Sequence, residues 1–242
     1  MMYRRLLLVS LGAVLVTCGR PVTEGAEVGE FVDFRSSALV WYPLGPHAAD
    51  RARGGARGTM HGSTPAMDRN GAPQGCLRFD GTDDYVEVPH SPGALQLGTH
   101  DFTLCAWVFT TDSACDDDAP AVIVAKGNPP GSGFALSLEC GKPCAFVGEV
   151  SENGCATVGG EISDGRWHHV GMVRGGGNVF LYADGQMVHR YNSTESVNTD
   201  QPLTLAKHPL EERGFFDGRI DDLIILDRAL SAAEMHSLAS GE

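Results

Sequence analysis

The sequence predicts an all-β domain, a sandwich or barrel built from short strands and closed by one short C-terminal helix. The first observation is a series of about a dozen short apolar runs separated by turn residues at fairly regular spacing. The second is Asp184-Gly185 between two such runs, which is a strong hairpin signal. The third is the scarcity of helix-period patterns, since only one segment near the C-terminus carries a helix start signal.

The expected strands are rich in β-branched, aromatic and leucine residues. Alternation in 102–109 places Phe102, Leu104, Ala106 and Val108 on one face and the residues between them on the other. A glycine- and arginine-rich loop is expected over 45–62. The expected strands are 38–44, 75–81, 85–89, 102–109, 121–125, 134–139, 145–149, 167–174, 178–183, 186–191, 203–206 and 220–226.

The last strand and the helix belong to one closing segment, 216–234. Ser231 and Glu234 form a capping box, so a helix should begin after Ser231. Asp221 and Asp222 lie inside the apolar strand, and alternation predicts that they point to opposite faces, so that at most one is easily buried. A buried carboxylate must be paired, hydrogen-bonded or bound to a metal. We expect this strand to dock beside the opening strand and close the sandwich.

The first 18 residues predict an export signal. Arg4 and Arg5 precede an apolar run, 6–16, that is too short to span a bilayer as a helix. The run leads into Leu15-Val16-Thr17-Cys18-Gly19, which resembles a bacterial lipobox except that Thr17 replaces the usual glycine or alanine.

The lipobox hypothesis makes Cys18 a lipidated mature N-terminus, and the alternative is an ordinary cleaved signal with an incidental cysteine. Residues 19–35 are expected to be a tether, and 36–242 the folded domain. A lipid at Cys18 would hold the domain at a membrane without spanning it. The predicted location is the outer membrane or cell surface, or otherwise secreted or periplasmic.

Six cysteines remain after Cys18. An even number in an exported chain predicts three disulfides, and the sequence does not choose among the possible pairings. A zinc site using the spacing of Cys140 and Cys144 is the alternative, although no second matching pair completes it. The six are Cys76, Cys105, Cys115, Cys140, Cys144 and Cys155.

Composition narrows the partner classes. The formal net charge is −13 at pH 7, and the sequence offers no basic stripe for phosphate contacts, so nucleic acid is not an expected partner. The acidity is compatible with solubility and with binding a cation.

An ordered set of motifs spans about 38–238 of the chain. The motifs are Trp41-Tyr42-Pro43-Leu44 with Asp50 downstream, and the segments 77–86, 102–108, 167–170, 181–185 and 216–234. This set resembles the laminin-G-like branch of the concanavalin A-like lectin/glucanase superfamily. The resemblance implies a jelly roll of two antiparallel sheets. It also implies a binding module for glycans or proteins, often with calcium, although some members of the wider superfamily are glycoside hydrolases or lyases.

The resemblance also implies where calcium would bind, because Asp50 and Asp221 match positions that lie near the ion in similar domains. Calcium takes six to eight oxygen ligands, which these acids and nearby carbonyls could supply. The alternative is that the two acids accept backbone hydrogen bonds or pair with Arg51, Arg53 or Arg219.

Other polar clusters have structural interpretations. Asp80, Asp83 and Asp84 are expected to bond local backbone in a turn, and the acidic run 116–118 to be a solvated loop tip. His168 and His169 point to opposite faces of a strand, and the matching family motif implies a structural role.

The expected function is that of a binding module outside the cell, for glycans or a surface protein, with a possible structural Ca²⁺ ion. The main alternative is a polysaccharide-degrading enzyme, and a protein-binding adhesin is the third hypothesis. No Glu-x-Asp-x-x-Glu, His-Glu-x-x-His or Gly-x-Ser-x-Gly motif occurs, which favours binding over catalysis. The ligand surface is expected in loops at one end of the sandwich or on its concave sheet.

Overall fold

The computed structural model describes residues 34–52, 56–93, 95–115, 120–129, 131–148, 154–156 and 160–241. The compact unit that contains them runs from Asp33 to Glu242. The predicted signal segment with Cys18, nearly all of the predicted tether and the acidic run 116–118 lie outside the described residues. Within the described part of the chain, no helix is both long and apolar enough to cross a membrane.

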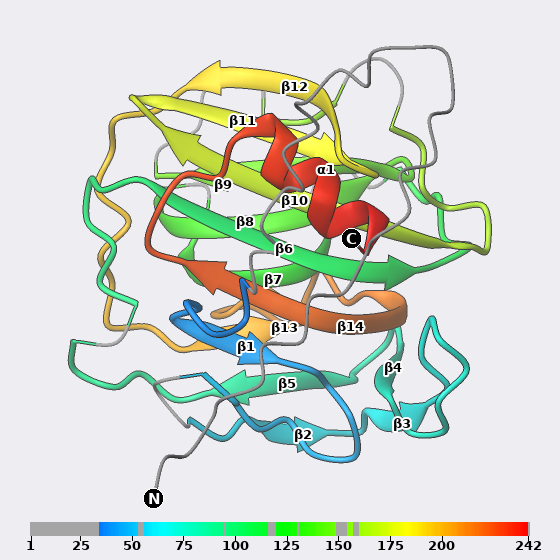
Figure 1. Ribbon diagram of the computed structural model, residues 1–242. Coiled ribbons are helices and arrows are strands. Elements are labelled where there is room, and N and C mark those ends of the chain that lie inside the picture. The colour runs from blue at the N-terminus through cyan, green and yellow to red at the C-terminus, as the bar shows by residue number, and fades with distance from the viewer. Residues whose placement is uncertain are drawn as a thin grey trace, which may run out of the picture. The chain divides into compact units, whose positions relative to one another are not determined.

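The described chain forms two antiparallel sheets, which confirms the predicted fold class (Figure 1). One sheet has eight strands, in the order β12 (Gln186–Asn192), β11 (Asn178–Ala183), β10 (Trp167–Gly175), β6 (Phe102–Phe109), β14 (Asp217–Leu226), β4 (Cys76–Asp80) and β3 (Thr64–Ala66), with β1 (Val40–Tyr42) also paired to β14. The other has six, in the order β2 (Thr59–His61), β5 (Tyr85–Val88), β13 (Leu203–Leu205), β7 (Ala121–Asn128), β8 (Ser132–Glu139) and β9 (Lys142–Val147).

Alternation along the strands produces the core between the sheets. Phe102, Leu104, Ala106 and Val108 of β6 are all fully buried, as the sequence predicts. The ring of Phe102 lies 5.5 Å, between centroids, from the ring of Phe134 on β8 in the opposite sheet. We call the side of the eight-stranded sheet that faces away from this core its outer face.

The one helix among the described residues covers part of that outer face. Helix α1 (Ala232–Ser240) begins with the predicted capping box, in which Ser231 and Glu234 bond each other's backbone N–H groups. Met235 is the buried residue of the helix, and it packs against Gly171 of β10, where a Cβ would lie 2.7 Å from the methionine Cε. The helix therefore lies over β10 (Figure 1), and a glycine permits its close approach.

Strand β14 docks beside β1, as expected, and Trp41 lies opposite Ile224. The strand starts at Asp217, three residues before the predicted boundary. One of its edges pairs with β4 over Asp217–Ile220 and then with β1 over Leu223–Ile225, while the other edge pairs with β6 from Arg219 to Leu226 with one irregularity after Asp221. The change of neighbour falls at Asp221 and Asp222.

The prediction that alternation separates Asp221 and Asp222 is wrong. Asp221 lies opposite Trp107 and Ile224 opposite Cys105, so β14 holds one residue more than β6 over this interval. This is a β-bulge, and Asp222 takes a positive φ of 44°, which aspartate tolerates better than most residues. The bulge interrupts the alternation, and both carboxylates are consequently buried.

The expectation of three disulfides also requires correction. Cys115 bonds Cys140, and Cys144 bonds Cys155, which excludes a zinc site built on the Cys140–Cys144 spacing. Cys76 and Cys105 are free and buried. They lie on β4 and β6 with β14 between these strands. Two strand spacings, about 10 Å, exceed the Cα separation that a disulfide spans.

Native-state alkylation tests this assignment. Burial raises the pKa of Cys76 and of Cys105 to about 12, so neither thiol should react with iodoacetamide in the folded protein. Both should become alkylated in denaturant without reductant, while the 115–140 and 144–155 peptides stay linked, as mass spectrometry would show. A Cys76–Cys105 peptide in the non-reduced digest would contradict the assignment, and a reduced sample in which every cysteine is labelled is the control.

Candidate functional site

A groove of about 1200 Å³ opens at the rim of the sandwich. Strand β1 contributes Leu39 (just before it), Val40 and Tyr42, and the segment 88–101 that follows β5 supplies most of the remaining lining. The lining is completed by Asp50 and Ala56, by Lys126 of β7 and Leu203 of β13, and by the residues 227–229 after β14. The groove is thus bounded by parts of both sheets and by loops of one rim.

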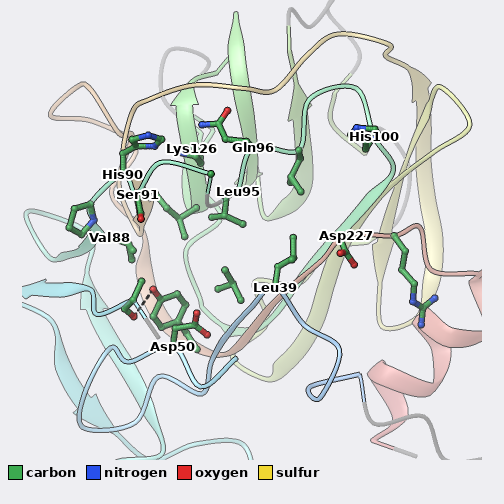
Figure 2. Close-up of a pocket in the computed structure, with 18 of the residues that line it drawn as sticks. Leu39, Asp50, Val88, His90, Ser91, Leu95, Gln96, His100, Lys126 and Asp227 are labelled. Carbon is green, nitrogen blue, oxygen red and sulfur yellow. Dashed lines mark hydrogen bonds between the residues drawn. The ribbon is translucent and has the colours of Figure 1, made fainter. Parts of the chain in front are cut away.

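The groove is lined by both apolar and hydrogen-bonding side chains. Leu39 and Leu95 lie near its centre, His100 and Asp227 on one side, and His90 on the other (Figure 2). Apolar walls with a few separated polar groups are typical of small-molecule sites. Such a surface suits a ligand that has apolar faces and hydroxyl groups around its edge.

Hydrogen bonds fix the polar rim of the groove to the segment 198–201. Gln96 donates its amide to the carbonyl of Thr199 at 3.2 Å, and Lys126 donates Nζ to the carbonyl of Gln201 at 2.6 Å. Burial lowers the pKa of Lys126, although the charge of nearby Asp200 opposes the shift. The buried ammonium therefore ties β7 to the loop instead of standing free in the groove.

Asp50 organises the wall of the groove beside β1. One of its carboxylate oxygens, Oδ1, accepts the N–H groups of Trp41 and Ala52 at 2.9 and 2.8 Å. Tyr42 donates its hydroxyl to the carbonyl of Ala56 at 3.1 Å, and burial raises its pKa. The alternative prediction for Asp50, that it accepts backbone hydrogen bonds, is confirmed.

Asp221 and Asp222 meet at one guanidinium. Arg69 bonds Asp221 through Nη1 and Asp222 through Nη2, the latter at 2.7 Å. Asp222 also accepts from Arg35 and from Trp41 Nε1, each at 2.9 Å. The partner is therefore not Arg219, and Arg35, which falls in the predicted tether, contacts the domain.

Sequence reasoning missed Arg69. No local signal could have found it, because 152 residues separate Arg69 from Asp221. The Arg69 guanidinium also lies over the Trp107 ring, 5.0 Å from its centroid. The cluster of Arg35, Trp41, Arg69, Asp221 and Asp222 thus joins the start of the domain to β14, and we refer to it as the bulge cluster.

The pKa values of the two acids in the bulge cluster are shifted in opposite directions. Burial raises the pKa of Asp221 to about 7, despite the attraction of Arg69. Burial also acts on Asp222, but hydrogen bonds from Trp41 and Arg69 and the charge of Arg35 hold its pKa below the usual value. Asp222 has three donors and Asp221 has one, so a proton on the pair resides on Asp221.

The donors around Asp50 and Asp221 do not fit a shared calcium ion. Asp221 is already paired with a cation, and one oxygen of Asp50 already accepts two N–H groups. Neither acid belongs to a group of three described ligand side chains close enough to hold a metal. Calcium binding by the chain stays a prediction.

The remaining polar motifs have local partners. Asp80 accepts from the N–H groups of Thr82 and Asp83, which is the turn bonding that the sequence predicts. His168 bonds carboxylates through both ring nitrogens, to Asp184 at 2.8 Å and to Asp164 at 2.9 Å. Burial opposes protonation of His168, but these two bonds raise its pKa on balance.

His169 faces the other way. Its ring lies 5.3 Å from that of Trp107 in an edge-on arrangement, and burial lowers its pKa to about 4. The two adjacent histidines therefore belong to separate environments and form no common site.

Comparison with known proteins identifies the family. The family model Laminin_G_3, described as "Concanavalin A-like lectin/glucanases superfamily", matches residues 80–236. The chain belongs to this superfamily. Among its relatives, sex hormone-binding globulin of Homo sapiens is 27% identical over 128 residues, which make up 52% of this chain and 31% of that protein. This concanavalin A-like chain therefore matches less than a third of the human protein.

Solved structures share the fold. The binding domain of Paraclostridial Mosquitocidal Protein 1 has a TM-score of 0.67 at 16% identity, covering 86% of this concanavalin A-like chain and 53% of that one. Domain 4 of AbnA, an extracellular GH43 arabinanase of Geobacillus stearothermophilus solved with arabinotriose, has a TM-score of 0.65 at 18% identity. The match covers 84% of this chain and 98% of that domain. At such identities the likeness shows the fold alone.

The titration of Asp221 predicts a pH-dependent stability. Its folded pKa of about 7 lies above the unfolded value near 3.9, so the folded state retains a proton between these pH values. This contribution is fully present below about pH 4 and is lost as the pH rises through 7. The loss of this contribution between pH 4 and pH 8 should lower the free energy of unfolding by about 1–3 kcal/mol.

Urea unfolding at a series of pH values measures this effect in the wild type and in Asp221→Asn. Buried His169 has a lowered pKa, so its own contribution to stability increases with pH and opposes that of Asp221. The quantity to compare is therefore the difference in the free energy of unfolding between the two proteins at each pH. The stability of Asp221→Asn relative to wild type should increase from pH 4 to pH 8. A difference that is independent of pH would contradict the assigned pKa.

Proposed function

We propose that this chain is an exported binding module that holds a glycan in the rim groove without transforming it. The observation that carries the proposal is the groove itself, in which Leu39 and Leu95 lie near the centre and polar side chains surround them, namely His90, Gln96, His100 and Asp227. Sugar rings present apolar C–H faces and equatorial hydroxyl groups. The leucine side chains of the groove can contact the C–H faces, and the surrounding polar side chains can bond the hydroxyl groups.

The comparison with domain 4 of AbnA supports a glycan as the ligand class. That domain was solved in complex with arabinotriose and corresponds to this chain over nearly its whole length. A fold of this kind can therefore serve as a complete glycan-binding unit. Since fold does not determine function, the argument for this chain still depends on the groove.

An oxidising compartment is the second part of the proposal. Two disulfides connect the segments around β8 and β9, and disulfides persist outside the reducing cytosol. With the signal-like start of the sequence, this supports export. Lipidation at Cys18 would then hold the binding domain at a membrane surface.

A glycan array tests the proposed function directly. The wild type should bind at least one glycan, and His100→Ala and Asp227→Asn should each weaken that binding about three- to tenfold, because each removes one polar contact from the groove. His236→Ala on α1 and Asp83→Asn in the turn after β4 are matched controls that lie outside the groove lining. Arrays with and without a chelator test the prediction of calcium.

Two outcomes would contradict the proposal. One is a wild-type protein that binds no glycan on a broad array. The other is binding that the groove variants and their controls weaken equally. Release of reducing ends or unsaturated products from polysaccharides would contradict the non-catalytic part and favour the enzyme hypothesis.

A further inference from the structure

A continuous row of side chains crosses the outer face of the eight-stranded sheet. The register places Thr64, Arg78, Arg219, Phe109 and Trp167 directly opposite one another on β3, β4, β14, β6 and β10. Residues directly opposite each other in antiparallel strands point to the same face. At about 4.8 Å per strand, the part from Arg78 to Trp167 is about 14 Å long. We call these five residues the outer row.

The outer row is open to solvent. Arg78 and Thr64 are exposed, and the other members are half-buried. The helix covers a different part of this face, around Gly171. The core-facing neighbours Phe79 and Ile220 are fully buried, which fixes the outward direction of the row.

The two arginines of the outer row lie directly opposite each other on neighbouring strands. Arg78 and Arg219 are register partners, and like charges directly opposite in a sheet are destabilising. Neither guanidinium lies within 4.0 Å of a carboxylate among the described residues. Asp80 and Asp217 lie opposite each other two residues away on the same face, and the charge of Arg78 acts on Asp84. These acids offset part of the repulsion, but among the described residues none of them forms an ion pair with either guanidinium.

Aromatic rings continue the row beside the arginines. The Arg219 guanidinium lies over the Phe109 ring, 4.9 Å from its centroid, and the rings of Phe109 and Trp167 are 5.8 Å apart. Within the described ranges, the hydrogen bond that the Arg219 side chain donates is a long one, to the carbonyl of Met67 at 3.4 Å. Guanidinium groups followed by aromatic rings along one line can bind an anionic group and stack an adjoining ring.

We propose that the outer row is a second binding site, for a glycan chain that carries carboxylate or sulfate groups. The arginine pair takes the anionic group in charge-assisted hydrogen bonds, and Phe109 and Trp167 stack against a neighbouring sugar. Charge complementarity identifies this occupant, because an anion between Arg78 and Arg219 replaces their mutual repulsion with two attractions. The site lies on the outer face and shares no residue with the rim groove.

The test uses a uronate hexamer, hexagalacturonate, and its fully methyl-esterified form, which has the same chain without the charges. The wild type should bind the acid at least tenfold more tightly than the ester in calorimetry. Arg78→Gln and Arg219→Gln should each weaken acid binding about tenfold, since each removes a charged hydrogen-bond donor. Arg190→Gln, which makes the same charge change at an exposed position on β12, should leave it within twofold.

Two further readouts distinguish the outer row from the rim groove and from an arginine pair that only stabilises the sheet. The ligand-free melting temperature of Arg78→Gln should rise by about 1–2 °C, because the substitution relieves the like-charge contact. His100→Ala in the groove should leave hexagalacturonate binding unchanged, so failure of the groove proposal and failure of this one are distinguishable. A sulfated dextran oligomer tests whether sulfate can replace carboxylate.

Several results would overturn the proposal. These are equal affinity for the acid and the ester, no binding of the acid at millimolar concentration, or equal weakening by Arg190→Gln. Tighter binding of a single-stranded oligonucleotide through the same two arginines would replace the glycan with another class of partner.

Discussion

One additional residue in strand β14 determines how this sandwich closes. The bulge at Asp221 and Asp222 turns two carboxylates towards Arg69, where strict alternation would have separated them. At the same point β14 exchanges β4 for β1 as its neighbour. Without the Arg69 guanidinium, Asp222 would keep Arg35 and Trp41 as partners, whereas Asp221 would lose the one hydrogen-bond donor that it has among the described residues. The bulge cluster therefore links the closure of the sheet to an ionic contact.

The groove depends on this closure. Strand β1, which forms one of its walls, is held on one side by β14 and on the other by the Asp50 carboxylate. The same sheet presents a second surface, because α1 covers the part of the outer face around Gly171 and Gly185 and leaves the outer row open. Two candidate ligand surfaces, one at the rim and one on a face, consequently share a single framework.

Local signals made the fold predictable. Alternation in β6 gave the core face, Asp184-Gly185 gave a hairpin, and Ser231 with Glu234 gave the start of α1. The two short strands β2 and β3 were not predicted, since three-residue strands at the edge of the sheets carry little periodic signal.

The sites were less predictable, because they depend on pairing between distant segments. A bulge cannot be distinguished from regular alternation in sequence, so the burial of both Asp221 and Asp222 was missed. Their partner Arg69 lies in a turn marked by Asn70-Gly71, but nothing in that segment indicates that Arg69 reaches Asp221. The segment 88–101, which lines much of the groove, has no strand pattern after Val88 and gave no indication of its place. The outer row depends on the register of five strands, which sequence does not supply.

Hydrogen–deuterium exchange of the wild type, with and without the tightest-binding glycan from the array, tests the central claim most directly. Backbone amides in 39–42 and 95–101 should exchange more slowly when the glycan is bound, while amides of α1 should be unchanged. Protection confined to segments outside the groove, at saturating glycan, would contradict the claim that the groove is the ligand site.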